Sequence, residues 1–235
     1  LEAEQGRGGA RGPRPGVAAA AACAACATAC AAARAAPGTG DRIEERLRGK
    51  RYAKAVLINN AGVISPVGML DAAFIKNQKT LLSRNIHFVD GLNEDLAATA
   101  VWGTQMLHTV GKQKFDGVTG LWYGKAPGVD RSGDALKHAN YTGIGKNGGV
   151  LAVAGDDPSC KSSSLCSQSE PMLMHVGIPS LYPGNVQEIL DLGLHGWAMS
   201  RYSGLWVGFK CVADTVESSA SVSIDPDRVN IVVPD

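Results

Sequence analysis

Two glycine-containing segments carry the side chains whose types and spacing indicate chemistry. Residues 91–103 read Gly-Leu-Asn-Glu-Asp-Leu-Ala-Ala-Thr-Ala-Val-Trp-Gly and place Glu94 in the first turn of an expected helix whose next residues are small. Residues 120–134 form an expected glycine-rich loop that carries Lys125, Asp130 and Arg131 directly after an apolar strand. Because small residues let a ligand approach the backbone closely, the two segments together predict a binding site.

Each segment also has a plainer interpretation. Asn93 is a good helix cap, and Glu94 and Asp95 complement the helix dipole, effects worth about 1 kcal/mol. For residues 120–134 the alternative to a site-lining loop is a solvent-facing connection between a strand and a helix. Residue chemistry alone favours the helix-dipole role for Glu94 and leaves both interpretations of the loop open.

The elements that must position these side chains alternate along the chain. Apolar, strand-like runs are followed by helix-like periodicity, the pattern of a mostly parallel sheet with helices on both faces, so the predicted fold class is α/β. The expected strands are 56–64, 86–89, 117–123, 149–154, 180–182 and 205–212, and the expected helices are 69–82, 93–107, 133–141, 165–176 and 186–202. Asn185 and Glu188 fit a capping-box start for the last helix.

Composition excludes several function classes. The net charge is +1, from 23 basic and 22 acidic residues that are interspersed, so nothing indicates a nucleic-acid partner. No long run of bulky apolar side chains predicts a membrane span. The histidines lack metal-ligand spacing, Cys23, Cys26 and Cys30 lack a fourth ligand, and the remaining cysteines are expected to be free thiols; no metal site is expected.

Residues 1–54 differ in composition from the rest of the chain. They comprise a leader rich in Ala, Gly and Arg and a charged connector, with too few bulky side chains for a core, and are expected to be disordered. The interpretations that stay open for the leader are an unstructured extension, translated non-coding sequence and an organelle transit peptide. Residues 55–235 are expected to form one domain, a fragment of a longer chain. The expected compartment is the cytoplasm, or an organelle if the leader is a transit peptide.

From about residue 86 onward the chain resembles the indolepyruvate ferredoxin oxidoreductase family, which oxidatively decarboxylates 2-oxo acids with thiamine diphosphate. The resemblance rests on residues 91–103 and 120–134 and continues through Gly-Val-Leu-Ala-Val-Ala-Gly-Asp-Asp at 149–157 and the segments 161–170, 185–197 and 200–218. It implies that the chain is the pyrimidine-binding region, with the thiamine-diphosphate-binding fold.

The resemblance also implies roles for individual residues. Glu94 is expected to be the catalytic carboxyl that hydrogen-bonds the aminopyrimidine and promotes loss of the thiazolium C2 proton. The residues expected to contact the cofactor are Glu94, Asn93, Gly120 and Tyr123, and the candidates for the substrate carboxylate are Lys125, Arg131 and Lys161. Mg²⁺ and the diphosphate are expected to be shared with a second, pyrophosphate-binding domain, and iron–sulfur clusters to lie elsewhere in an enzyme that passes electrons to ferredoxin and is expected to be a homodimer.

The chain departs from the family after Ser65, where an expected loop of Tyr, Arg, Gly and Ser is replaced by Pro66-Val-Gly68. The sequence also lacks the Gly-Asp-Gly motif that holds Mg²⁺ and the diphosphate. A degenerate, non-catalytic fragment that acts as a structural or interaction domain is therefore the alternative. A nicotinamide dehydrogenase, suggested by Asn59-Asn-Ala-Gly62, is disfavoured because no Tyr is followed four residues later by Lys.

Overall fold

The computed structural model describes residues 74–75, 77–109, 111, 113–161, 163–224 and 228–234, together with the backbone of residues 52–60. The Ala-rich leader and the segment around Ser65 lie outside these described residues. The division of the chain at residue 54 therefore stays a prediction.

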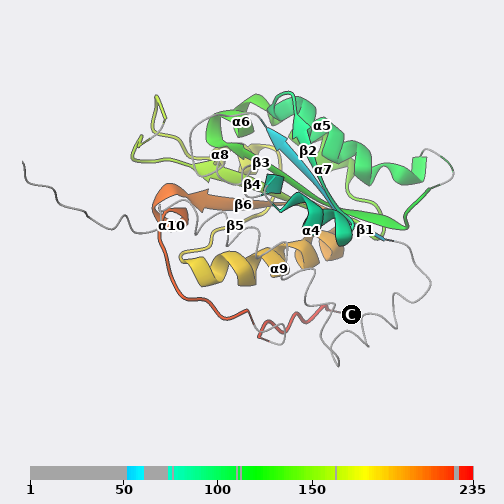
Figure 1. The fold of residues 1–235 in the computed structure, drawn as a ribbon. Coiled ribbons are helices and arrows are strands. Elements are labelled where there is room, and N and C mark those ends of the chain that lie inside the picture. Colours follow the sequence, from blue (N-terminus) through cyan, green and yellow to red (C-terminus); the bar gives the residue numbers. More distant parts are fainter. Residues whose placement is uncertain are drawn as a thin grey trace, which may run out of the picture.

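A parallel sheet runs through the middle of the molecule (Figure 1). Every strand pairing in the described part is parallel. This agrees with the apolar runs 117–125, 149–156 and 206–212, which are buried on both faces. The α/β class is thus confirmed. The strand order is β2-β1-β3-β4-β6-β5, and the strands are β1 (Tyr52–Asn60), β2 (Ile86–Gly91), β3 (Gly117–Lys125), β4 (Gly149–Asp156), β5 (Ser180–Leu181) and β6 (Trp206–Val212).

Helices cover both faces of this sheet (Figure 1). One face carries α5 (Glu94–Gln105), α6 (Ala126–Arg131), α7 (Gly133–Thr142) and α8 (Glu170–His175). The other face carries α4 (Gln78–Ser83) and the long α9 (Val186–Ser203). The short 3₁₀ helix η1 (Leu107–Thr109) follows α5, and α10 (Ala213–Val216) follows β6.

Neighbouring residues of β3 supply the two cores, because side chains alternate between the faces of a strand. Trp122 packs with Val101, Leu136 and Trp206 on the α5 face. Tyr123 packs with residues of α9 on the opposite face and lies 6.2 Å from the ring of Phe74. Burial of a large apolar side chain contributes roughly 1.5–3 kcal/mol, so Trp122 and Tyr123 anchor β3 on both of its faces.

Helix α9 is fixed at its start and along its buried side. Asn185 accepts a hydrogen bond from the Glu188 amide at 3.0 Å, and the Glu188 carboxylate accepts bonds from the Asn185 side chain and from the amide of Gly184. The two predicted capping residues are thus confirmed, but the return bond goes to the residue before the N-cap and not to the N-cap amide of a standard capping box. Further along, a β-carbon on Gly196 would lie 2.7 Å from Cδ2 of Leu151, so glycine permits the close approach of helix and sheet. Trp197 donates to the carbonyl of Gly120 at 3.1 Å and ties α9 to β3.

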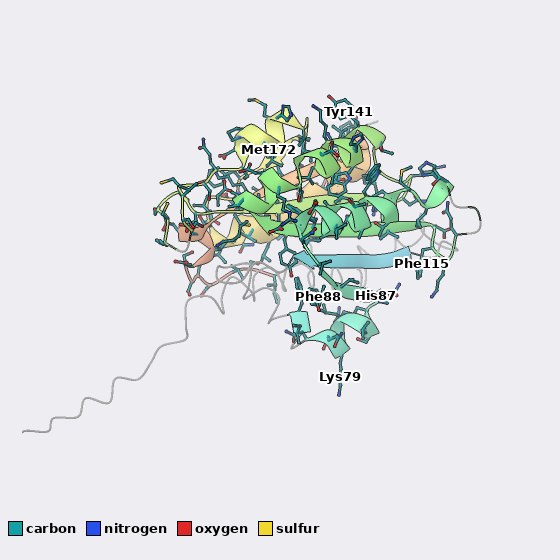
Figure 2. The ribbon with its side chains drawn as sticks, turned by 90° about the horizontal axis from the view of Figure 1, so that it is seen from above. Lys79, His87, Phe88, Phe115, Tyr141 and Met172 are labelled. Carbon is teal, nitrogen blue, oxygen red and sulfur yellow. The ribbon has the colours of Figure 1, made fainter. Side chains whose placement is uncertain are left out.

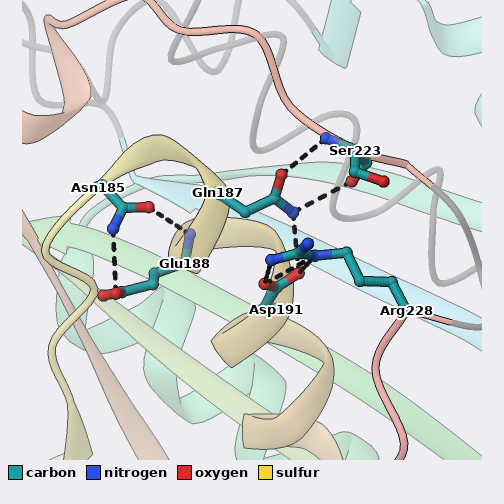
Figure 3. Close-up of polar contacts among 6 residues, drawn as sticks. All are labelled: Asn185, Gln187, Glu188, Asp191, Ser223 and Arg228. Carbon is teal, nitrogen blue, oxygen red and sulfur yellow. Dashed lines mark hydrogen bonds and ion pairs between the residues drawn. The ribbon is translucent and has the colours of Figure 1, made fainter.

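The segment after α10 returns along the exposed side of α9 (Figure 3). Gln187 bonds both the amide and the carbonyl of Ser223, at 2.7 and 3.1 Å, and Arg228 forms a bidentate ion pair with Asp191. In the view from above, Lys79 of α4 and Met172 of α8 mark opposite ends of the molecule, in agreement with the strand order (Figure 2). Within the described residues, no helix combines the length and apolar character needed to cross a bilayer.

Candidate functional site

The strand order defines a switch point between β1 and β3. From β1 the chain continues to β2 at one edge of the sheet, whereas from β3 it continues to β4 in the opposite direction. Open α/β sheets bind ligands at the carboxyl ends of the strands beside such a point. Two described segments leave the carboxyl edge of the sheet near the switch point. One begins with Leu92 after β2, and the other begins with Ala126 after β3.

Glu94 lies at this edge, as the first residue of α5. Asn93 precedes it as the N-cap, and its side chain accepts a hydrogen bond from the Leu96 amide at 2.9 Å. The Glu94 side chain is 19% exposed, so it is largely packed yet open to a ligand. The helix start therefore presents one carboxyl group beside the switch point.

Two glycines and a tryptophan form the wall behind Glu94. A β-carbon on Gly128 would lie 2.5 Å from Cγ of Glu94 and 3.1 Å from its Oε1, and one on Gly124 would lie 3.7 Å from the same Cγ. The buried Trp122 donates from Nε1 to the Glu94 carbonyl at 3.0 Å. These contacts hold the first turn of α5 against β3 and α6. On the α6 side they require a glycine, because a larger residue at position 128 would collide with Glu94.

Arg131, at the end of α6, pairs with the acidic first turn of α5. Its Nε lies 3.1 Å from Oδ1 of Asp95, and its Nη1 lies 3.9 Å from Oε2 of Glu94. Because the Arg131 side chain is 55% exposed, solvent screens both pairs and each contributes no more than about 1 kcal/mol. Arg131, predicted as a substrate contact, is therefore engaged by this helix in the structure.

Gly120 and Tyr123 lie away from this carboxyl. Gly120 is within β3, between α5 and α9, where a β-carbon would lie 2.9 Å from Cγ1 of Val101. Tyr123 is fully buried in the core on the face opposite α5. The structure gives both residues a packing role and does not bring either beside Glu94.

The predicted glycine-rich loop over residues 120–134 is wrong in its secondary structure. Strand β3 continues to Lys125, and α6 begins directly afterwards, with Pro127 in its first turn. Proline is tolerated there because its missing N–H has no partner within a helix start. The segment is therefore a strand end and a short helix, which fixes the position of Gly128.

The two lysines predicted to meet a substrate lie in different places. Lys125 is the N-cap of α6 at the carboxyl end of β3, one residue after Gly124. Lys161 follows β4 and pairs with Asp214 and Glu217 near α10. Its hydrogen bond to Asp214 raises the pKa of Lys161. Lys125 therefore lies at the end of the strand that supports Glu94, whereas Lys161 is paired with acidic residues at α10.

A second polar cluster lies at the carboxyl end of β4. Asp156 is buried, its Oδ2 accepts hydrogen bonds from the amide and hydroxyl of Ser169, and the ammonium of Lys210 lies 3.4 Å away. Lys210 also pairs with Glu170 and lies over the Tyr182 ring, 4.8 Å from its centroid.

Burial raises the pKa of Asp156 against the hydrogen bonds of Ser169 and the charge of Lys210. Burial opposes the charge of Lys210, but its hydrogen bond to Glu170 and the charge of Asp156 outweigh this effect and raise the pKa of Lys210. Asp156, Lys210 and Glu170 thus pair with one another, although Oδ1 of Asp156 and Oε2 of Glu170 are buried without a hydrogen-bond partner. Nowhere in the described part of the chain do three or more His, Cys, Asp or Glu side chains form a group suited to a metal ion.

Comparison with curated proteins supports the predicted family resemblance. The chain is 26% identical over 166 residues to the indolepyruvate oxidoreductase subunit IorA of Methanothermobacter marburgensis, which covers 70% of this chain and 25% of that protein. It is 32% identical over 83 residues to the protein of the same name from Pyrococcus horikoshii, which covers 35% of this chain and 12% of that protein. The chain thus spans a quarter or less of each relative. No family model matches the chain.

Two solved structures share the fold. The 2-oxoglutarate:ferredoxin oxidoreductase of Magnetococcus marinus aligns with a TM-score of 0.56 and 11% identity, over 88% of this chain and 32% of that one. A thiamine diphosphate-dependent 4-hydroxybenzoylformate decarboxylase of Rhodococcus jostii aligns with a TM-score of 0.52 and 14% identity, over 86% of this chain and 32% of that one. The chain therefore shares the α/β fold of these two enzymes, in agreement with the predicted fold class.

Sequence reasoning did not identify Gly128, Trp122 and Lys210 as neighbours of chemically active groups. Gly128 stood within a recognised glycine-rich segment, but its contact with a carboxylate depends on how α6 packs on α5. Trp122 was assigned only to a strand. For Lys210, a charged residue inside an otherwise apolar strand was the available signal.

Proposed function

We propose that this unit is the pyrimidine-binding region of a thiamine-diphosphate-dependent 2-oxoacid:ferredoxin oxidoreductase of the indolepyruvate type, with Glu94 as its acid–base residue. The observation that carries the proposal is the position of Glu94. Its carboxyl group is largely packed, begins a helix and lies at the carboxyl edge of the sheet beside the switch point. The IorA relatives and the two structural neighbours support the same assignment.

Thiamine diphosphate, when bound, supplies a nucleophilic carbon for attack on the carbonyl of a 2-oxo acid. Glu94 would share a proton between its carboxyl group and a nitrogen of the aminopyrimidine ring. Trp122 and Gly128 would hold the carboxyl at a fixed place, because one anchors its backbone and the other packs on its side chain. A positioned acid–base group of this kind typically contributes about 10²–10⁴-fold to rate.

The charges around Glu94 are compatible with this role. Arg131 is the cation paired with the Glu94 carboxylate, at 3.9 Å and largely in solvent. Breaking this ion pair when a ring packs against the Glu94 carboxyl group would cost little free energy, because Arg131 keeps its shorter contact with Asp95. Asn93 would act through the helix start that it caps, and Lys125 is the remaining candidate near this edge for a substrate carboxylate.

The described residues do not fit a site for Mg²⁺, since they contain no suitable group of ligands. We therefore assign Mg²⁺ and the diphosphate to a second, pyrophosphate-binding domain, and the iron–sulfur clusters and the contact with ferredoxin to further parts of a dimeric enzyme. This assignment agrees with the small share of the IorA relatives that the chain spans. On this assignment the chain by itself binds thiamine diphosphate weakly, and calorimetry should detect no micromolar, Mg²⁺-dependent binding.

The test replaces Glu94 with Gln in the full-length enzyme and follows hydrogen–deuterium exchange at the thiazolium C2 by NMR. Glutamine keeps the size of the side chain but cannot hold the carboxyl proton, so exchange should slow by about 10²-fold or more. Asp95→Asn is the matched control, because it removes the neighbouring carboxylate from the same turn and should leave exchange within about threefold of the unsubstituted enzyme. An unchanged exchange rate in the Gln variant would leave Glu94 only its interaction with the helix dipole at the start of α5 and favour the non-catalytic alternative.

A further inference from the structure

Two thiols lie close together on the segment between β4 and α8, away from Glu94. The Sγ atoms of Cys160 and Cys166 are 3.4 Å apart. Cys166 is exposed and Cys160 is half-buried. Sulfur atoms in a disulfide lie about 2.05 Å apart, so a displacement of about 1.4 Å at an exposed segment would join them.

The backbone holds the two residues together independently of the thiol contact. Ser169 anchors the segment on the buried Asp156, and the Asp157 amide donates to the hydroxyl of Ser167 at 3.4 Å. On the other side, Cys160 donates from its amide to the carbonyl of Asp157 at 3.2 Å. These contacts fix the start and the end of the segment, so the proximity of the cysteines follows from the fold.

Cys160 has a backbone conformation that cysteine rarely adopts. Its φ angle is +53°, in the left-handed region that favours glycine, asparagine and aspartate. Non-glycine residues in this region are concentrated at functional sites, where the surrounding structure holds them in place. Here the conformation accompanies the contact between the two sulfur atoms.

The two thiols differ in exposure and in their hydrogen-bond roles. The hydrogen bond from the Cys160 thiol to the sulfur of Cys166 raises the pKa of Cys160. Cys166, the more exposed of the two residues, accepts this hydrogen bond. An exposed thiolate with a second thiol in reach is the usual arrangement for thiol–disulfide exchange.

We infer that Cys160 and Cys166 form a redox-active dithiol, which a low-molecular-weight disulfide oxidises reversibly to an intrachain disulfide. The Cys166 thiolate attacks one sulfur of the small disulfide, forms a mixed disulfide and releases one small thiolate. The Cys160 sulfur, after loss of its proton, then attacks the Cys166 sulfur and releases the second. Two protein thiols become one disulfide, the small disulfide is reduced to two thiols, and the two protons from the protein go to them.

Tryptic cleavage places the two cysteines on different peptides, so a disulfide between them can be identified by mass. Trypsin cleaves after Lys146, Lys161 and Arg201, so Cys160 lies on the peptide 147–161 and Cys166 on the peptide 162–201. The whole chain is reduced, equilibrated with a series of ratios of oxidised to reduced glutathione, alkylated and digested. The expected product is a cross-link of these two peptides that grows with the ratio and disappears after treatment with dithiothreitol.

The variants separate this pair from the other cysteines. Cys160→Ser should abolish the cross-link and leave a glutathione adduct on Cys166, whereas Cys166→Ser should give less adduct on Cys160. Cys211→Ser, which alters a half-buried thiol in β6, should keep the cross-link at the same ratio. The inference is overturned if both peptides remain alkylated at every ratio, or if Cys160 or Cys166 links preferentially to another cysteine. This outcome does not depend on the role of Glu94, because the readout is peptide mass.

Discussion

Gly128 packs directly on Glu94, with no room between them for a side chain. A β-carbon at position 128 would lie 2.5 Å from Cγ and 3.1 Å from Cδ of Glu94, distances below those of ordinary contacts. Gly128 lies within α6 and has none of the positive φ angles that require glycine. Its importance is therefore steric: the absent side chain allows α6 to support the first turn of α5.

Replacing Gly128 with Ala should destabilise the fold by about 1–3 kcal/mol, because the new methyl group forces Glu94 or α6 to move. In a double-mutant cycle with Glu94→Ala, which removes the opposing atoms, the coupling energy should be about 1 kcal/mol or more. Urea unfolding of the four proteins measures it. Gly103→Ala in α5 is the matched control, because its β-carbon would have no neighbour within 4 Å, and it should stabilise by about 0.5–1 kcal/mol. Additive effects at Gly128 and Glu94 would contradict the contact.

The contribution of the hydrogen bond from Trp122 to the Glu94 carbonyl can be measured by comparing substitutions of two tryptophans. Trp122 and Trp206 are both fully buried, but Nε1 of Trp206 has no hydrogen-bond partner whereas Nε1 of Trp122 donates at 3.0 Å. Trp122→Phe should therefore cost about 1 kcal/mol more than Trp206→Phe in free energy of unfolding. Equal losses would mean that this bond does not stabilise the start of α5.

Asn93 should act through the helix start. Asn93→Ala removes the bond to the Leu96 amide and should cost about 1 kcal/mol of stability, as should Asn185→Ala, which removes the equivalent bond to Glu188 in α9. Thermal unfolding of both variants compares the two losses of stability. If Asn93→Ala leaves stability unchanged, the cap does not contribute and a direct ligand contact becomes the better explanation for Asn93.

The buried Asp156 should give the stability of the fold a characteristic pH dependence. Burial raises its pKa, so the folded state keeps a proton at pH values where the unfolded chain has lost it. The stabilisation linked to Asp156 is present below the unfolded pKa and is lost as the pH rises through the folded pKa. Asn does not ionise, so the destabilisation caused by Asp156→Asn, measured by urea unfolding, should shrink as the pH rises above the ordinary pKa of an aspartate, about 3.9.

Asp191 provides a control of opposite sign. Burial opposes its charge, but the bonds from Arg228 and Gln187 outweigh this effect and lower the pKa of Asp191 (Figure 3). Its stabilisation is present above the unfolded pKa and is lost as the pH falls through the lower folded pKa. The destabilisation caused by Asp191→Asn should therefore stay level or grow as the pH rises. A parallel trend in both variants would refute the assignment for Asp156.

The sequence predicted the elements whose signals are local. Apolar runs such as 149–154 indicate strands buried on both faces, and the periodicity of 186–202 with its capping residues indicates a long helix; both lie where expected. The position of Glu94 at a helix start also followed from its neighbours, because Asn93 is a strong N-cap.

Helix α6 and the surroundings of Glu94 could not be predicted in this way. Pro127 and Gly128 are poor helix formers, and α6 forms because it packs against β3, α5 and α8. Gly128 meets Glu94 only after three strands have assembled in a non-sequential order. The pairing of Lys210 with Asp156 likewise joins two strands that are distant in sequence, and no periodic pattern records it.

The place of β6 between β4 and β5 bears on how the chain folds as it leaves the ribosome. Strand β4 is complete at Asp156, but its hydrogen-bonding partner on that side begins only at Trp206. At a synthesis rate of roughly 5–20 residues per second, an apolar strand edge stays unpaired for several seconds. Such an edge is a template for aggregation, so the nascent chain depends on chaperones or on early packing of α9 until β6 emerges and closes the gap.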